Sequence, residues 1–123
     1  MNLDLTETQR MMQESLSGFL EANVSLDHIR DLEKKQGWDK ALWNKLVEQG
    51  WLELAAPDRD VGGNLIDLAL AVECLSRRAA LVPFLEDALC GWVLRASGTE
   101  AIERSKVSEG DVIVTPALLE AAD

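Results

Sequence analysis

Apolar residues recur at helical spacing from near the start of this chain. The first such segment follows Thr6 and is predicted to end near Asn23, with an apolar face made by Met12, Leu16, Phe19 and Leu20. Gln9 follows Thr6 at the spacing of a capping box, in which each side chain bonds the other's backbone N–H. The pattern therefore predicts a capped amphipathic helix at the N-terminus.

The next segment, residues 26–36, is more polar. Its apolar stripe is short, with only Leu26, Ile29 and Leu32, and Gly37 follows as a terminator. We expect a helix that lies on the surface.

Residues 38–50 give the clearest local signal. Asp39 is placed to cap a helix whose buried face is Leu42, Trp43, Leu46 and Val47. Trp38 and Trp43 then occupy the two positions of a hydrophobic staple, and Gly50 suits a left-handed residue after the last turn.

Turn residues dominate positions 55–64, which are predicted to form a loop within one domain. Residues 65–79 are apolar around most of a helix, as expected in the middle of a bundle. Pro83 suits the first turn of another helix, and Gly98 is predicted to end it. The apolar residues between them follow helical spacing: Leu85, Ala88, Leu89, Trp92, Val93 and Ala96. A short helix is predicted over 99–106.

Residues 111–115, DVIVT, form the first β-branched run of the chain and predict a strand. A single strand needs partners, so we expect it to begin a sheet. The predicted fold class is all-α, a bundle of about six helices with a short β-strand beginning at the C-terminus. The predicted domains are a helical domain over 1–110 and an incomplete β-domain over 111–123.

Composition and net charge make some classes of binding partner unfavourable. The 123 residues are 47% hydrophobic, enough for one core, and the net charge of −10 disfavours nucleic acid and anionic membranes. No signal peptide or membrane span is predicted, so a cytoplasmic location is expected. Cys74 and Cys90 lie within helical patterns and are expected to be reduced core thiols.

No catalytic or metal-binding motif is visible. His28 lies near Asp27 and Asp31 without another imidazole or thiolate, and a solvated surface residue is favoured over a metal or proton-transfer role. Asp67 and Glu73 are the carboxylates expected to be partly buried and hydrogen-bonded, in structural roles. We therefore assign no catalytic residue and no metal ligand.

Four stretches in order resemble the acyl-CoA dehydrogenase family: DLTETQRMMQESLSGFL, WDKALWNKLVEQGWLELAAPDRDVGG, LIDLALAVECLSRRAALVPFLEDAL and SGTEAIERSKVSEGDVIVTPALLE. The likeness covers nearly all of this chain and the N-terminal part of the family. It implies an FAD-dependent enzyme that takes an acyl-CoA substrate, whose catalytic base and most flavin contacts lie in other parts. This chain alone is then not competent.

The resemblance also suggests site residues. Helices of this part close the acyl-chain cavity, which makes Val82, Leu85, Ala88 and Leu89 candidates for its wall, with ordinary core packing as the alternative. Leu118 and Leu119 match a stretch that approaches the flavin, but Leu119 stands where the family has a threonine. A second hypothesis is a non-catalytic helical module that self-associates or docks on a flavoprotein partner subunit.

Overall fold

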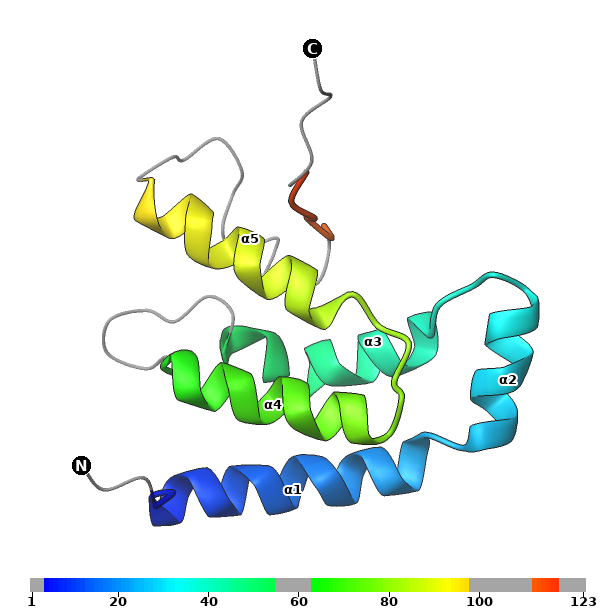
Figure 1. The fold of residues 1–123 in the computed structure, drawn as a ribbon, viewed down its shortest axis with the longest axis horizontal. Coiled ribbons are helices and arrows are strands. Elements are labelled where there is room, and N and C mark those ends of the chain that lie inside the picture. Colours follow the sequence, from blue (N-terminus) through cyan, green and yellow to red (C-terminus); the bar gives the residue numbers. More distant parts are fainter. Residues whose placement is uncertain (1–3, 55–62, 98–111, 118–123) are drawn as a thin grey trace. The chain divides into compact units, whose positions relative to one another are not determined.

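The computed structural model describes residues 4–54, 63–97 and 112–117. In these ranges the chain forms five α-helices and one 3₁₀ turn, and no strand is assigned (Figure 1). The all-α prediction is therefore confirmed for the described residues. The predicted helix over 99–106 lies outside them, as does Asp111 of the predicted strand, and residues 112–117 adopt no regular strand.

The described residues fall into two compact units. One comprises residues 4–43 and 64–82, and the other residues 44–54, 63, 83–97 and 112–117. Helix α3 (Lys40–Glu48) contributes to both. Each unit is described separately below.

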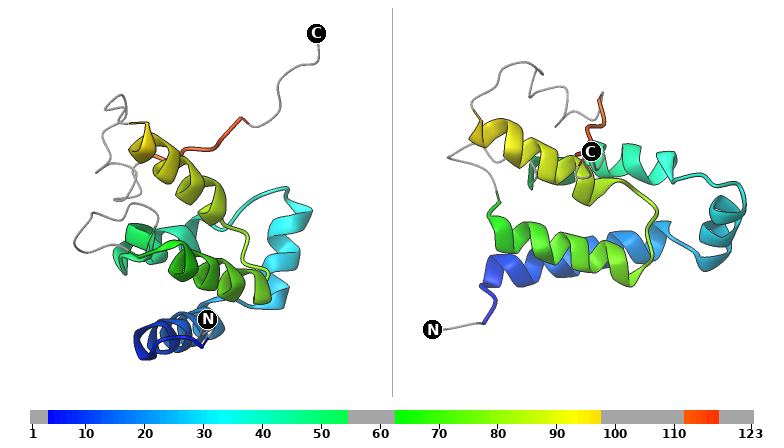
Figure 2. Two further views of the ribbon diagram at one scale, coloured as in Figure 1. Left: turned by 60° about the vertical axis from the view of Figure 1, so that its left-hand side comes forward. Right: turned by 45° about the horizontal axis from the view of Figure 1, so that its top comes forward.

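In the first unit, α1 (Glu7–Asn23) packs along α4 (Leu65–Arg77), and the two lie side by side in every view (Figures 1 and 2). The predicted capping box of α1 is confirmed: Gln9 N–H donates to Thr6 Oγ1, and Thr6 N–H donates to Gln9 Oε1. Leu16 and Leu20 are buried on α1. They share the core with buried residues of α4, Leu68, Leu70, Ala71, Cys74 and Leu75.

The start of α4 is capped in the same way. Asn64 Oδ1 accepts from the N–H groups of Ile66 and Asp67, and Asp67 Oδ2 accepts from Asn64 N–H. Asp67 is half-buried and bonds Gln9, as predicted for a structural carboxylate. The prediction of partial burial is wrong for Glu73, which is exposed and pairs with Arg77 one turn later.

Helix α2 (Leu26–Lys34) has no buried residue, which confirms its predicted surface position. Its end differs from the prediction in one respect. The left-handed residue is Gln36, with φ of 51°, rather than Gly37. Gln36 N–H bonds Glu33 C=O and Gly37 N–H bonds Leu32 C=O, so the turn closes one residue earlier than the glycine suggests.

The signals around α3 are confirmed. Asp39 Oδ1 accepts from Leu42 N–H at 2.9 Å, as an N-cap does, and the rings of Trp38 and Trp43 meet edge to face with centroids 6.3 Å apart. Gly50 adopts φ of 76°, the left-handed conformation predicted for it. The 3₁₀ turn η1 (Trp51–Leu54) follows and buries Leu52.

Candidate functional site

Helix α5 (Phe84–Ala96) carries the candidate site, in the second unit. Pro83, predicted to lie in the first turn, directly precedes the first residue of α5, at a helix start where proline loses no N–H bond. Phe84, Ala88 and Cys90 are buried, and α5 packs on η1. The helix therefore has a core-facing side formed by these residues.

The opposite side of α5 is apolar and exposed. Leu85, Leu89 and Val93 are spaced by four residues and so share one face of the helix; we call them the α5 stripe. Their exposed fractions are 42%, 39% and 65%. Sequence spacing had grouped these residues with Ala88 on one apolar face, but only Ala88 is fully buried.

The four residues predicted to line the pocket therefore differ in their exposure to solvent. Leu85 and Leu89 lie on the α5 stripe and remain available to a ligand or another surface. Val82 is half-buried just before the helix, and Ala88 has no exposed surface, so it belongs to the core. The two predicted flavin contacts, Leu118 and Leu119, lie outside the described residues.

Asp87 is the unexpected member of this region. It is fully buried, and its Oδ1 accepts a hydrogen bond of 2.9 Å from Val114 N–H, across 27 residues of sequence. Its Oδ2 is buried without a hydrogen-bond partner among the described residues. Burial raises the pKa of Asp87 to about 6, partly offset by the Val114 N–H, which lowers it. Nothing in the sequence pattern distinguishes this aspartate from its exposed neighbour Glu86.

Cys90 lies one turn after Asp87 on α5. Burial raises the pKa of its thiol, and the nearby Asp87 charge raises it further. Both Cys74 and Cys90 are buried free thiols, which confirms the prediction for them. A thiol with a raised pKa is a poor nucleophile, so Cys90 is a packing residue.

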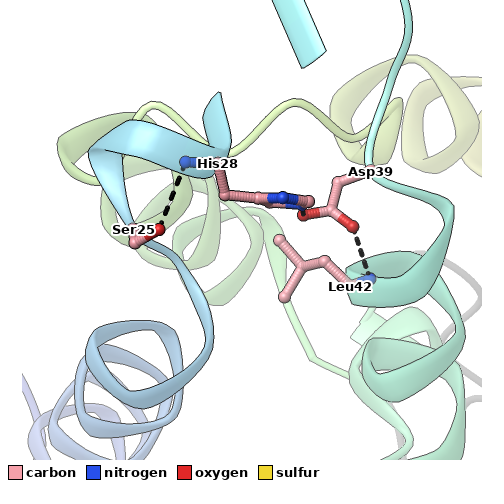
Figure 3. A network of polar contacts seen from close by, with 4 residues as sticks. All are labelled: Ser25, His28, Asp39 and Leu42. Carbon is pink, nitrogen blue, oxygen red and sulfur yellow. Dashed lines mark hydrogen bonds and ion pairs between the residues drawn. The ribbon is translucent and has the colours of Figure 1, made fainter. Parts of the chain in front are cut away.

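A second polar cluster lies in the first unit, around the single histidine (Figure 3). His28 is exposed, as predicted, yet its Nε2 lies 3.0 Å from Asp39 Oδ2. Serine can act as a nucleophile in enzymes, but here Ser25 Oγ accepts a hydrogen bond from the backbone N–H of His28 and caps α2. The cluster is therefore a set of helix caps linked by the contact of His28 with Asp39, and it is not arranged as a catalytic triad.

Metal-ligating clusters and membrane-spanning helices are both absent from the described ranges. No group of three or more His, Cys, Asp or Glu residues there could hold a metal ion. The described helices also lack the length and apolar content of a membrane-spanning segment.

Comparison with known proteins agrees with the fold. The family described as acyl-CoA dehydrogenase, N-terminal domain, matches residues 6–107. The acyl-CoA dehydrogenase FadE27 of Mycobacterium tuberculosis (strain ATCC 25618 / H37Rv) is 31% identical over 127 aligned positions, which cover 96% of this chain and 34% of that protein. The chain thus spans about a third of this relative's length. No solved structure matches the chain.

Proposed function

We propose a function from one premise: the chain belongs to the acyl-CoA dehydrogenase family and matches its N-terminal domain. The chain then forms part of an FAD-dependent enzyme that dehydrogenates an acyl-CoA thioester between the α and β carbons. Residues 1–110 would be the helical domain, and 111–123 the start of a β-domain. The role proposed for this chain is to supply one wall of the acyl-chain pocket.

The α5 stripe carries this proposal. Leu85, Leu89 and Val93 present a row of hydrocarbon on a helix whose other face is anchored in the core. Such a row can cover an alkyl chain, and each methylene removed from water contributes about 0.8 kcal/mol. The net charge of −10 opposes the phosphates of coenzyme A, so the nucleotide end is proposed to bind elsewhere in the enzyme.

FAD would supply the acceptor for the β-hydride in the complete enzyme. The stripe does not fit the isoalloxazine ring, because its side chains offer no donor or acceptor for the ring's polar edge. The side chains of the α5 stripe are therefore proposed to act on the acyl chain and not on the flavin. They orient the acyl chain and keep water from the reacting carbons.

The proposal is tested by binding of acyl-CoA thioesters of increasing length. Trp92 lies on α5 and provides a fluorescence signal beside the stripe. Affinity is expected to rise from butanoyl- to octanoyl- to hexadecanoyl-CoA, and Leu89→Gln should remove most of this length dependence. Leu65→Gln, on α4 at another exposed leucine (63% against 39% for Leu89), is the control and should leave the length dependence unchanged. Equal affinity for all lengths and for coenzyme A itself would reject the acyl-chain wall.

A second function is favoured by the same exposure: a helical module that docks through the α5 stripe on a flavoprotein subunit or on another copy. Light scattering of the protein decides whether copies associate, and Val93→Lys should then dissociate them. A monomer at all concentrations, with no binding to a flavoprotein of this family, would exclude this alternative.

A further inference from the structure

Asp87 has a property that the proposed function does not use. A buried carboxylate in a native structure is normally paired with a cation or bonded through both oxygens. Among the described residues the carboxylate of Asp87 has one hydrogen-bond donor, Val114 N–H, and its second oxygen is buried without one. The residue connects two segments far apart in the sequence, α5 and residues 112–117, which lie close together in the same unit (Figure 2).

We infer that Asp87 is a proton-operated latch, which holds residues 112–117 against α5 while its carboxyl group is neutral and releases them when it ionises. Burial of the neutral acid costs less than burial of the carboxylate, and the neutral acid can still accept from Val114 N–H. The ionised group needs partners for both oxygens, but among the described residues a single N–H, that of Val114, reaches it. Displacement of residues 112–117 would admit water to the carboxylate and relieve this cost.

Among the described side chains of α5, η1 and residues 112–117, none supplies a positive charge to the ionised form. On α5, Glu86 is exposed and Cys90 is a thiol whose pKa is raised, so neither supplies positive charge. Residues 112–117 carry no ionisable side chain, and the one on η1 is the exposed Glu53. The carboxyl pKa near 6 agrees with this environment, since burial is its largest cause. A pKa raised in the docked state means that docking is favoured at low pH and is lost as pH rises through about 6.

The test is nuclear magnetic resonance of the isotopically labelled protein. Two signals are followed with pH: the side-chain carboxyl carbon of Asp87 and the hydrogen exchange of the Val114 amide, corrected for the intrinsic effect of pH. The carboxyl carbon should titrate near pH 6. The corrected exchange of Val114 should increase over the same range, by up to about a hundredfold for a shift of two pKa units. Exchange of the Leu16 amide on α1 serves as an internal reference and should not follow this titration.

Two variants complete the experiment. Asp87→Asn keeps an oxygen for Val114 but cannot ionise, so the corrected exchange of Val114 should become independent of pH. Glu86→Gln removes an exposed charge from the adjacent position and should reproduce the wild-type curve. The wild-type titration decides the question even if Asp87→Asn does not fold. Titration of Asp87 at the value of an ordinary exposed carboxyl, or a Val114 exchange rate that does not change with pH, overturns the latch.

Discussion

His28 Nε2 lies 3.0 Å from Asp39 Oδ2, so the single histidine of the chain bonds the same carboxylate whose other oxygen caps α3. Asp39 N–H also donates to Leu81 C=O at 2.7 Å. One nearly buried residue thereby joins α2, the start of α3 and the segment after α4. Its loss should affect the stability of the whole first unit.

Asp39→Ala is expected to lower the free energy of unfolding by about 2 kcal/mol, because it removes an N-cap and the partner of His28. Asp39→Asn keeps the oxygen that Leu42 N–H needs and should cost less than half as much. Urea denaturation measures both. Asp31→Ala, which breaks only an exposed pair with Lys34, is the control, expected within about 0.5 kcal/mol of wild type. An Asp39→Ala variant as stable as this control would refute the role.

A bond between Gln9 and Asp67 connects two capping boxes. Gln9 Nε2 donates to Asp67 Oδ1 at 2.9 Å, while each residue also caps its own helix. A double-mutant cycle with Gln9→Ala and Asp67→Ala should therefore give a coupling energy of about 1 kcal/mol. The same cycle with Gln9→Ala and Glu73→Ala should be additive. Additivity in both cycles would show that the bond contributes nothing to stability.

The raised pKa of Asp87 predicts how global stability depends on pH. Since the pKa goes from 3.8 to about 6 on folding, the folded state binds the proton more tightly. The contribution is fully present below about pH 4 and is lost as pH rises through 6, a loss of up to about 3 kcal/mol. Asp87→Asn should remove this component of the pH dependence, whatever its effect on stability at any one pH. Parallel stability curves of wild type and variant between pH 4 and about 7 would contradict the prediction.

Gly50 and Gln36 both have left-handed backbone conformations, so replacing the glycine should destabilise the protein and introducing a glycine should stabilise it. Gly50, with φ of 76°, should not tolerate a side chain, and Gly50→Ala is expected to cost about 1 kcal/mol. Gln36, with φ of 51°, already bears that cost, so Gln36→Gly should stabilise the protein by a few tenths to about 1 kcal/mol. Gly37→Ala is the control, because an added Cβ would meet only ordinary contacts near Leu32. Thermal unfolding measures all three. A destabilised Gln36→Gly would show that Gln36 contributes more than its backbone conformation.

Helix caps and side-chain contacts within one or two turns were predictable from the sequence, because they join residues only a few positions apart. The capping box of Thr6 and Gln9, the cap at Asp39 and the contact of Trp38 with Trp43 each follow from such spacing. The error at Gln36 has a similar origin, since a left-handed turn can form one residue before the glycine that usually marks it. The acyl-CoA dehydrogenase family was also readable, from the order of motifs.

The candidate site was only partly predictable. Spacing placed Leu85, Ala88 and Leu89 together on an apolar face, but it could not show which side of α5 meets the core. That choice depends on Phe84 and on packing against η1, which is distant in sequence. For the same reason Asp87 was missed, as its burial and its bond to Val114 depend on a segment 27 residues away.

The five described helices, most of their caps and the family could be read from the sequence, because these depend on local spacing and on the order of motifs along the chain. Only tertiary packing leaves Leu85, Leu89 and Val93 exposed while Asp87 is buried. Tertiary packing also brings His28 Nε2 within hydrogen-bond distance of Asp39 Oδ2. These outcomes depend on which surfaces meet when distant segments pack, and a helix repeats its residue pattern equally well for any rotation about its axis.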